Sequence, residues 1–247
     1  MPLEVIYEDE WLVAINKPAG LIMHPAKHDT ADTLVNGLQW YLDQSAPATG
    51  LLRPGIVHRL DKNTSGVLVS TRDHLSHRQL SISFQDREVR KTYLAIVEGC
   101  PRPESGTIDT PLGGTTAPDS SLVSAEPDAI APRSARTDFT VLDKFAGCSL
   151  VEARPLTGRL HQIRVHLASI GHPVLGEPFY GPHGEIRCDR DGRPLIKPPV
   201  NPPWPTIARH ALHARSLAFD HPITGQPLTI EAPLPDDFQQ ALAKATN

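Results

Sequence analysis

The sequence predicts an α+β fold, in which strands pair as hairpins more often than they alternate with helices. Short apolar runs of strand type follow one another closely, and only three segments have helical spacing. Proline is frequent, at 25 of 247 residues, but none lies between Pro54 and Pro101, so this stretch can form uninterrupted helices and strands. The hydrophobic content of 39% is enough for a substantial core, and without a repeat or linker we expect one domain over residues 1–247.

The first hundred residues contain the clearest predicted elements. Residues 5–18 form two strands around an acidic turn, and a proline ends the second strand. Residues 31–42 have apolar side chains at helical spacing behind Asp32, a possible helix cap. The remaining elements are a buried strand at 66–70, a helix at 72–84 and a strand at 90–99.

The second half is predicted to contain two strand pairs and one helix. The strands at 137–142 and 148–155 form a hairpin around a short polar turn. Residues 157–171 form a helix with Thr157 as its cap and Gly171 as its stop. Two further strands close the sheet, at 212–222 and 227–233.

Two segments are predicted as surface loops within the domain. Residues 113–135 are rich in Gly, Pro, Ser and Ala, and we expect a mobile loop there. Residues 182–205 contain seven prolines, several charges and no hydrophobic period, which indicates an extended loop.

The net charge of −4 argues by itself against a protein that binds a polyanion. The distribution of charge changes this interpretation, because residues 53–93 carry a net +4 and residues 153–176 a net +3, against −5 over residues 98–143. If the two basic segments meet in the fold, they form a local positive surface. The charges alone equally allow ordinary solvated faces.

Composition limits the location and the chemistry. No apolar run approaches the roughly 18 residues of a membrane span, and the N-terminus lacks the apolar core of a signal peptide, so we expect a cytoplasmic protein without a membrane partner. The three cysteines lack C-x-x-C spacing and are expected to be unpaired thiols. The pairs His24 with His28 and His210 with His213 lack a third ligand nearby, so we expect no metal. Signatures of serine hydrolases, P-loops and dinucleotide-binding loops are absent from the sequence.

The stretch HRLDKNTSG, residues 58–66, concentrates groups that could do chemistry. Asp61 lies between a loop and a predicted strand, and Thr64, Ser65 and Gly66 allow a tight turn there. A carboxylate at such a junction is a common catalytic position. An aspartate that only bonds its own loop is the alternative, and this stretch alone favours it.

In the helix predicted at 157–171, Arg164 lies at the edge of an apolar stripe, about 40° from Leu160 at 100° per residue. A guanidinium there needs an anionic partner or must extend to water, which is the commoner outcome. His161 lies further out. The stripe consists of Leu160, Ile163, Leu167 and Ile170. Polar side chains that face elsewhere, and that suit phosphate or structural contacts, are Arg159, Gln162 and His166.

Tyr93 alternates with Ala95 and Val97 on one face of the strand at 90–99. A tyrosine in a strand commonly belongs to the core with its hydroxyl bonded. This strand alone therefore favours a structural role for Tyr93.

Five segments occur together in a fixed order. HRLDKNTSG is preceded by NKPAGLIMHP and followed by KTYLAIVEG, TGRLHQIRVHLASIGHPVLG and HALHARSLAFDHP. This combination, which spans about residues 4–235, resembles the RluA family of RNA pseudouridine synthases. The resemblance implies the pseudouridine synthase fold, with a mixed, mostly antiparallel β-sheet core, flanking helices and a central active-site cleft.

The resemblance implies roles for the residues that match. Asp61 matches the catalytic aspartate, Arg164 the arginine that pairs with it, and Tyr93 the tyrosine that stacks on the uracil and is implicated in removal of its C5 proton. An Arg164–Asp61 pair would supply the partner that this arginine needs and keep the carboxylate ionised. Arg59 matches the arginine that enters the RNA stack where the target base has left. Further RNA-binding residues are expected to be Lys62, Lys91, Arg159, His161 and Gln162.

The implied reaction is isomerisation of uridine to pseudouridine in ribosomal or transfer RNA. The Asp61 carboxylate attacks the nucleoside, the N-glycosidic bond breaks, the uracil rotates, and its C5 joins C1′ and loses a proton. Attack at C1′, attack at C6 and a glycal route all remain open. No redox, metal or nucleotide cofactor is needed, and we expect a monomer.

Two departures from the family pattern stand out. The core begins within a few residues of Met1, so we expect a catalytic core without the S4 RNA-binding domain of many relatives. Where the family has G-D-x-x-Y-G, this chain has GEPFYG with Glu177, a difference expected to touch none of the catalytic residues. The alternative function is a non-catalytic RNA-binding or assembly factor on the same fold, against which the intact Asp61, Tyr93 and Arg164 argue.

Overall fold

The structure of the chain is a computed structural model, and it confirms the α+β class. Most strands belong to antiparallel pairs, and the helices are few. The structure describes residues 3–24, 33–45, 54–115, 122–189, 193–196 and 204–246.

The chain divides into two compact units. Unit 1 consists of residues 1–91 and 214–234. Unit 2 consists of residues 92–213 and 235–247. Two of the three boundaries fall inside strands, namely β5 (Arg90–Glu98) and β12 (Leu212–Asp220), and the third lies just before the C-terminal helix. The single domain over residues 1–247 stays a prediction.

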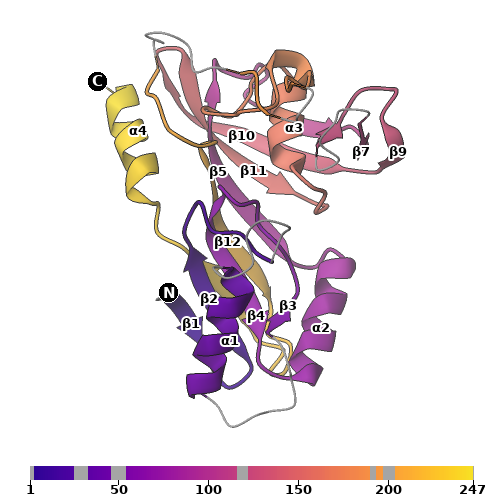
Figure 1. Cartoon of the computed structure of the whole chain (residues 1–247), viewed down its shortest axis with the longest axis vertical. Coiled ribbons are helices and arrows are strands. Elements are labelled where there is room, and N and C mark those ends of the chain that lie inside the picture. The colour runs from indigo at the N-terminus through magenta and orange to yellow at the C-terminus, as the bar shows by residue number, and fades with distance from the viewer. Residues whose placement is uncertain are drawn as a thin grey trace. The chain divides into compact units, whose positions relative to one another are not determined.

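Unit 1 is built on a sheet with two helices (Figure 1). Across the sheet the strands are β1 (Val5–Glu8), β2 (Leu12–Lys17), β4 (Ser65–Thr71), β12 and β13 (Pro227–Glu231), with the short β3 (Gly55–Ile56) paired to the end of β4. The helices are α1 (Leu34–Ser45) and α2 (His74–Gln85). The core of the unit comes from both ends of the sequence and includes Leu12, Val67, Val69, Leu80, Leu217, Phe219 and Ile230.

The predicted elements of unit 1 are confirmed. β1 and β2 form a hairpin around Asp9, and all seven residues of β4 are buried. The carboxylate of Asp73 accepts hydrogen bonds from the backbone N–H groups of Leu75 and Ser76, at 2.8 and 3.0 Å, and so caps α2. For α1, the predicted cap Asp32 lies outside the described residues.

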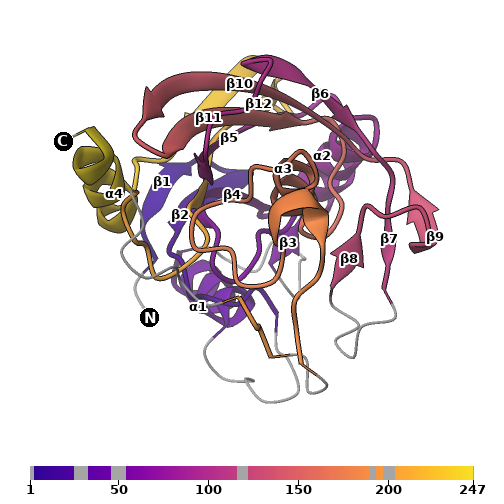
Figure 2. The ribbon, with the colours of Figure 1, turned by 90° about the horizontal axis from the view of Figure 1, so that it is seen from above.

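Unit 2 contains two sheets and two longer helices. The strands of its larger sheet are β5, β11 (Cys148–Pro155), β10 (Arg136–Phe145) and β6 (Ser105–Asp109), each antiparallel to the next. The smaller sheet is formed by β8 (Val123–Ser124), β7 (Leu112–Gly114) and β9 (Ile130–Arg133). The helices are α3 (Gln162–Ser169), which packs against β10 and β11 (Figure 2), α4 (Asp236–Thr246) and the single turn Pro182–Gly184.

The predicted loop at residues 113–135 contains three short strands that were not predicted. β7 pairs with both β8 and β9, and Leu122 packs in a core cluster with Val165 and Tyr180. The strands are only two to four residues long, which is too short for the alternation of a strand to show in the sequence. The second predicted loop contains the turn Pro182–Gly184 and an isolated bridge between Cys188 and Pro194.

The predicted helix at 157–171 begins later than expected. Thr157 does not cap it; its hydroxyl accepts from the Arg136 N–H at 3.1 Å and donates to Gln162 Oε1 at 2.6 Å. The residue before the helix, His161, has a left-handed φ of +53°. The helix α4 was not predicted, although two aspartates in its first turn and the buried pair Phe238 and Ala241 carry a helical signal.

Gly66, in β4, is a position where a side chain does not fit. Its φ is +114°, and a Cβ atom there would lie 2.1 Å from the carbonyl oxygen of Ala214 on β12. Gly66→Ala is therefore expected to lower the free energy of unfolding by at least about 3 kcal/mol, because it combines backbone strain with a clash. Urea denaturation measures this. In the control Gly225→Ala, φ is +68° but nothing lies within 4 Å, so only strain of about 1 kcal/mol is expected. Equal losses in the two variants would contradict the close approach.

Candidate active site

The turn that carries Asp61 is held by hydrogen bonds from both sides. The Thr64 N–H donates to the Asp61 carbonyl oxygen at 3.1 Å and closes the turn before β4. The next carbonyl oxygen, that of Lys62, accepts from the Gly20 N–H at 2.9 Å and from Lys17 Nζ at 3.0 Å. Asp61 itself is half-buried. The Asp61 carboxylate of unit 1 is thus accessible to solvent, while hydrogen bonds fix the backbone of its turn.

Lys17 is a support of this turn that sequence reasoning missed. The side chain is completely buried, and its ammonium donates to the carbonyl oxygens of Pro18 and Lys62, at 2.9 and 3.0 Å. A buried ammonium requires such acceptors. The available signal was a lysine at the end of an apolar strand, directly before a proline.

His58, for which the sequence suggested no role, is structural. Its Nε2 accepts a hydrogen bond from the Val69 N–H at 3.0 Å, and its ring stacks on Phe84 with 4.9 Å between centroids. Burial, and then the charge of Lys91, lower the pKa of His58 to about 3. His58 is therefore neutral at physiological pH, as its acceptor role requires.

Three basic side chains of unit 1 were predicted to bind RNA. Arg59 and Lys62 flank Asp61 in the sequence, and both are exposed. Lys91, at the start of β5, is half-buried. Burial, and then repulsion by Arg87, lower the pKa of Lys91 to about 8, so its charge changes just above neutral pH.

Tyr93 lies on β5 opposite Ala153 of β11, in unit 2. It is half-buried, whereas the following Ala95, Ile96 and Val97 are completely buried. Tyr93 thus belongs to the less covered end of its strand. This partly exposed position fits a platform for a ligand better than it fits a core residue.

Arg164, on α3, is buried and bound by Glu177. Its Nε donates to Glu177 Oε2 and its Nη2 to Glu177 Oε1, each at 2.7 Å, and the two side chains are only 4% and 2% exposed. Of the two outcomes that the sequence left open for Arg164, the structure has an anionic partner and not extension to water. The prediction that the exchange of aspartate for Glu177 touches no catalytic residue is wrong, because Glu177 binds a proposed one.

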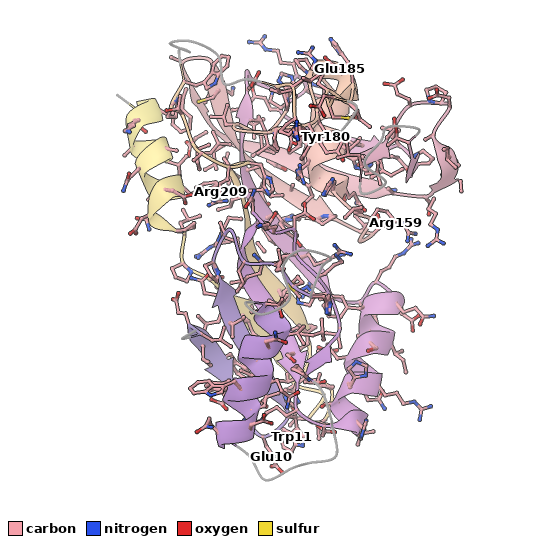
Figure 3. All side chains as sticks on the ribbon, in the orientation of Figure 1. Glu10, Trp11, Arg159, Tyr180, Glu185 and Arg209 are labelled. Carbon is pink, nitrogen blue, oxygen red and sulfur yellow. The ribbon has the colours of Figure 1, made fainter. Side chains whose placement is uncertain are left out.

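Tyr180, which is labelled in Figure 3, also contacts this guanidinium. Its ring centroid lies 5.3 Å from Arg164 Cζ, a cation–π arrangement. The completely buried Tyr180 places its hydroxyl 2.7 Å from His161 Nδ1, and this hydroxyl accepts the Val123 N–H at 3.3 Å. Glu177 and Tyr180 both come from GEPFYG, the turn that the sequence had set apart from the catalytic residues.

The predicted apolar stripe of α3 is wrong, because this helix is buried on all sides from Gln162 to Ala168, while Ile170 is exposed. Gln162 uses its amide inside the protein, accepting from Thr157 and the Arg159 N–H and donating to Arg136 O and Thr137. His166 likewise bonds Thr137 Oγ1 and Thr110 O. Arg159 is half-buried, and its Nε donates to Ser134 O at 3.1 Å.

Each unit thus assembles part of the predicted site. Unit 1 contains Asp61, which lies between Arg59 and Lys62 in the sequence, on a turn that the buried Lys17 binds at the Lys62 carbonyl oxygen. Unit 2 contains Tyr93, and Glu177 and Tyr180 of its turn GEPFYG contact Arg164. The pairing of Asp61 with Arg164, and the central cleft, stay predictions.

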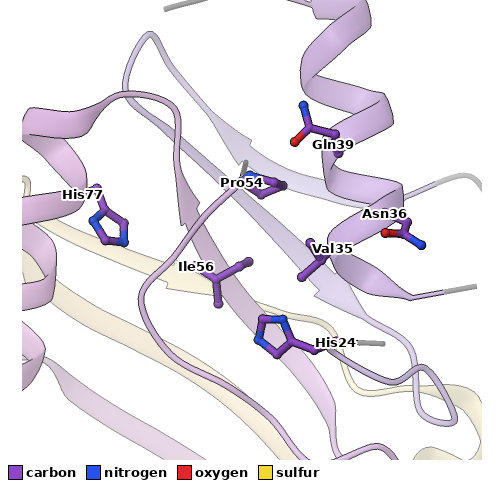
Figure 4. Close-up of a pocket in the computed structure, with 7 residues that line it drawn as sticks. All are labelled: His24, Val35, Asn36, Gln39, Pro54, Ile56 and His77. Carbon is purple, nitrogen blue, oxygen red and sulfur yellow. The ribbon is translucent and has the colours of Figure 1, made fainter. Parts of the chain in front are cut away.

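A groove of about 590 Å³ in unit 1 contains none of the predicted site residues (Figure 4). It is lined by His24, Val35, Asn36, Gln39, Pro54, Ile56 and His77. Within the described ranges, no group of three or more His, Cys, Asp or Glu side chains could hold a metal ion. None of the helices in the described part of the chain combines the length and apolar character that a membrane span requires.

Comparisons with known proteins agree with these motifs. The sequence profile of the family described as RNA pseudouridylate synthase matches residues 11–169. The chain is 38% identical over 242 residues to an RNA pseudouridine synthase of Bacillus subtilis (strain 168), an alignment that covers 98% of this chain and 72% of that protein. It is 39% identical over 238 residues to ribosomal large subunit pseudouridine synthase D of Pseudomonas aeruginosa, covering 96% and 69%.

A solved structure supports the same assignment. The structure of human RNA pseudouridylate synthase domain containing 4 matches with a TM-score of 0.68 and 26% identity, covering 98% of this chain and 92% of that chain. Both the sequence and the fold therefore agree over nearly the whole length. The chain belongs to the RluA family of RNA pseudouridine synthases, which are isomerases that act on RNA.

Proposed function

We propose that this protein converts specific uridines in RNA to pseudouridine with Asp61 as its nucleophile. The carboxylate attacks the nucleoside, the N-glycosidic bond breaks, and the uracil rotates. C5 of the uracil then bonds to C1′, the bond to the carboxylate breaks, and the proton lost from C5 is balanced by a proton gained at N1. Substrate and product contain the same atoms in the same oxidation state, so the proposal includes no cofactor. The observation that carries it is the fixed turn of unit 1, which presents Asp61 half-buried between the exposed Arg59 and Lys62.

Two residues of unit 2 complete the proposed site. Tyr93, on the less covered end of β5, stacks on the target uracil after it has left the RNA helix. Arg164 pairs with the Asp61 carboxylate. Glu177 binds the guanidinium through Nε and Nη2.

The proposed RNA surface is defined by exposed or half-buried basic groups. In unit 1 these are Arg59, Lys62 and Lys91, and in unit 2 they are Arg159 and His161. Gln162 is not included, because it is buried and its amide is already bonded within the protein. Phosphate contacts position the RNA, and Arg59 fills the space that the flipped base leaves.

For the substrate we propose ribosomal RNA of the large subunit. Relatives from Zymomonas mobilis and Pseudomonas aeruginosa carry that substrate in their names, at 38% and 39% identity. Tritium release from RNA labelled at uracil C5 tests this, with large-subunit RNA and transfer RNA assayed separately. Tritium release from transfer RNA alone would contradict the proposed substrate and support the proposed reaction. Wild-type protein that releases no tritium from total RNA of its own source would contradict the isomerase activity. Mapping pseudouridines in cells that lack the gene would identify the target uridine, because the pseudouridine at that position would be missing.

RNA binding is expected to weaken by about tenfold between pH 7 and pH 9, because Lys91, with its pKa of about 8, loses its charge over this range. The lowered pKa sets the sign, since the ammonium is charged below pH 8 and neutral above it. Fluorescence anisotropy with labelled RNA at constant ionic strength measures the affinity. In Lys91→Arg the charge persists at both pH values, so its affinity should change much less. A parallel decline in both proteins would show that Lys91 does not contact the RNA.

A further inference from the structure

The catalytic arginine of the proposed site is fixed by one carboxylate. Glu177 binds the Nε and Nη2 edge of Arg164 with two parallel hydrogen bonds of 2.7 Å. A fork of this kind sets both the distance and the plane of the guanidinium. The ring of Tyr180, 5.3 Å from Arg164 Cζ, adds a contact with the guanidinium face. Arg164 is therefore constrained along one edge and over one face.

Glu177 is itself immobilised by its surroundings. Its Oε1 also accepts the Phe179 N–H at 3.1 Å. The preceding Gly176 has a φ of +73°, and a Cβ atom there would lie 2.2 Å from the Arg209 carbonyl oxygen, so the turn packs closely on its neighbour. Tyr180, at the far end of the turn, is anchored through His161 and Val123. The carboxylate thus approaches Arg164 from a backbone that cannot easily shift.

The pair is more than a simple way to bury an arginine. Two apolar side chains would fill the same space with less desolvation, so burial alone does not explain two charges here. The contact with Glu177 uses the edge of the guanidinium formed by Nε and Nη2, and the five donors of an arginine can bind more than one carboxylate. A guanidinium between two carboxylates can orient one of them only if the other holds it still.

We propose that Glu177 is a positioning residue for the isomerisation, which acts through Arg164 on the nucleophile Asp61. This inference rests on the proposed function. It predicts that removing the negative charge of Glu177 slows the chemical step without weakening RNA binding. It also predicts that a shorter carboxylate at this position rescues part of the rate, because Glu177→Asp would retain the charge and the fork while losing one methylene of reach.

The test compares Glu177→Gln with Glu177→Asp in single-turnover tritium release. At saturating RNA, we expect the rate of Glu177→Gln to fall on the order of 10²-fold, with the half-saturating RNA concentration unchanged within about threefold. Glu177→Asp is expected to lie between this variant and the wild type. The matched control is Asp237→Asn, because Asp237 also forms a two-bond pair with an arginine of unit 2, Arg209, at 2.7 and 2.9 Å. This control should retain the wild-type rate.

The outcomes separate the inference from the proposed function. All rates are measured below the unfolding temperature of every variant, and circular dichroism gives the folded fraction. If the wild type is active and folded Glu177→Gln reacts equally fast, the positioning role is overturned while the proposed function stands. Should Glu177→Gln not fold, Glu177→Asn is compared with Glu177→Asp, and folded Glu177→Asn that reacts as fast as Glu177→Asp would overturn the role instead. Wild-type protein without activity would overturn both.

Discussion

Replacing Asp61 by asparagine is expected to lower the rate of tritium release by at least about 10⁴-fold, while RNA affinity stays within about threefold. Asparagine has nearly the shape of aspartate but lacks the negative charge of the nucleophile. The turn should survive the change, because the bonds that close it involve the backbone of Thr64 and the Lys62 carbonyl oxygen. Single-turnover tritium release and fluorescence anisotropy measure the two quantities.

The control for this variant is Asp86→Asn, which neutralises an exposed aspartate of the same unit at the end of α2. Its rate should equal that of the wild type. An Asp61→Asn protein that retains more than a hundredth of the activity would exclude Asp61 as the nucleophile. Loss of RNA binding together with activity would instead indicate that Asp61 shapes the RNA surface.

Replacing Arg164 by alanine is expected to lower the free energy of unfolding by about 3–5 kcal/mol and to abolish tritium release. The loss of stability follows because Glu177, whose side chain is 2% exposed, would remain as a buried charge without its partner. Urea denaturation measures the stability. The ring of Tyr180 would also lose its cation, so the packing of the turn should loosen.

A double variant separates the two effects of Arg164. Arg164→Leu with Glu177→Leu removes both charges together and should recover most of the lost stability, since apolar residues replace buried ion pairs well. The same double variant should stay inactive, because no cation faces the nucleophile. Recovery of activity with stability would contradict a direct role for Arg164. A single Arg164→Ala variant as stable as the wild type would contradict the buried pair.

The sequence predicted those parts of the fold whose signals are local. The strand β4 is a continuous apolar run, and the cap of α2 is an aspartate that bonds the two N–H groups after it, so both are visible within a few residues. The helix α3 was misjudged because a helical wheel assumes one face toward solvent. Its polar Gln162 and His166 are buried by strands and loops from other parts of the chain.

The candidate site shows the same division. The motif order identified Asp61, Tyr93 and Arg164 as residues of one family pattern, and no single stretch would have done so. The contact of Glu177 with Arg164 was not predicted, because the two residues lie 13 positions apart and only the turn at Gly176 returns Glu177 to the helix. The pKa of Lys91 depends on burial and on Arg87, and neither effect can be derived from the lysine itself.

The discontinuity of unit 1 has a consequence for biosynthesis. Its core needs Leu217, Phe219 and Ile230, and the strand that carries Asp61's turn packs at Gly66 against Ala214. A ribosome releases these residues only after the whole of residues 92–213 has emerged. During that interval the apolar face of β4 lacks its later neighbours and is open to wrong contacts. The strand β4, which follows the turn of Asp61, therefore gains its last packing partners only when residues 214–234 have been synthesised.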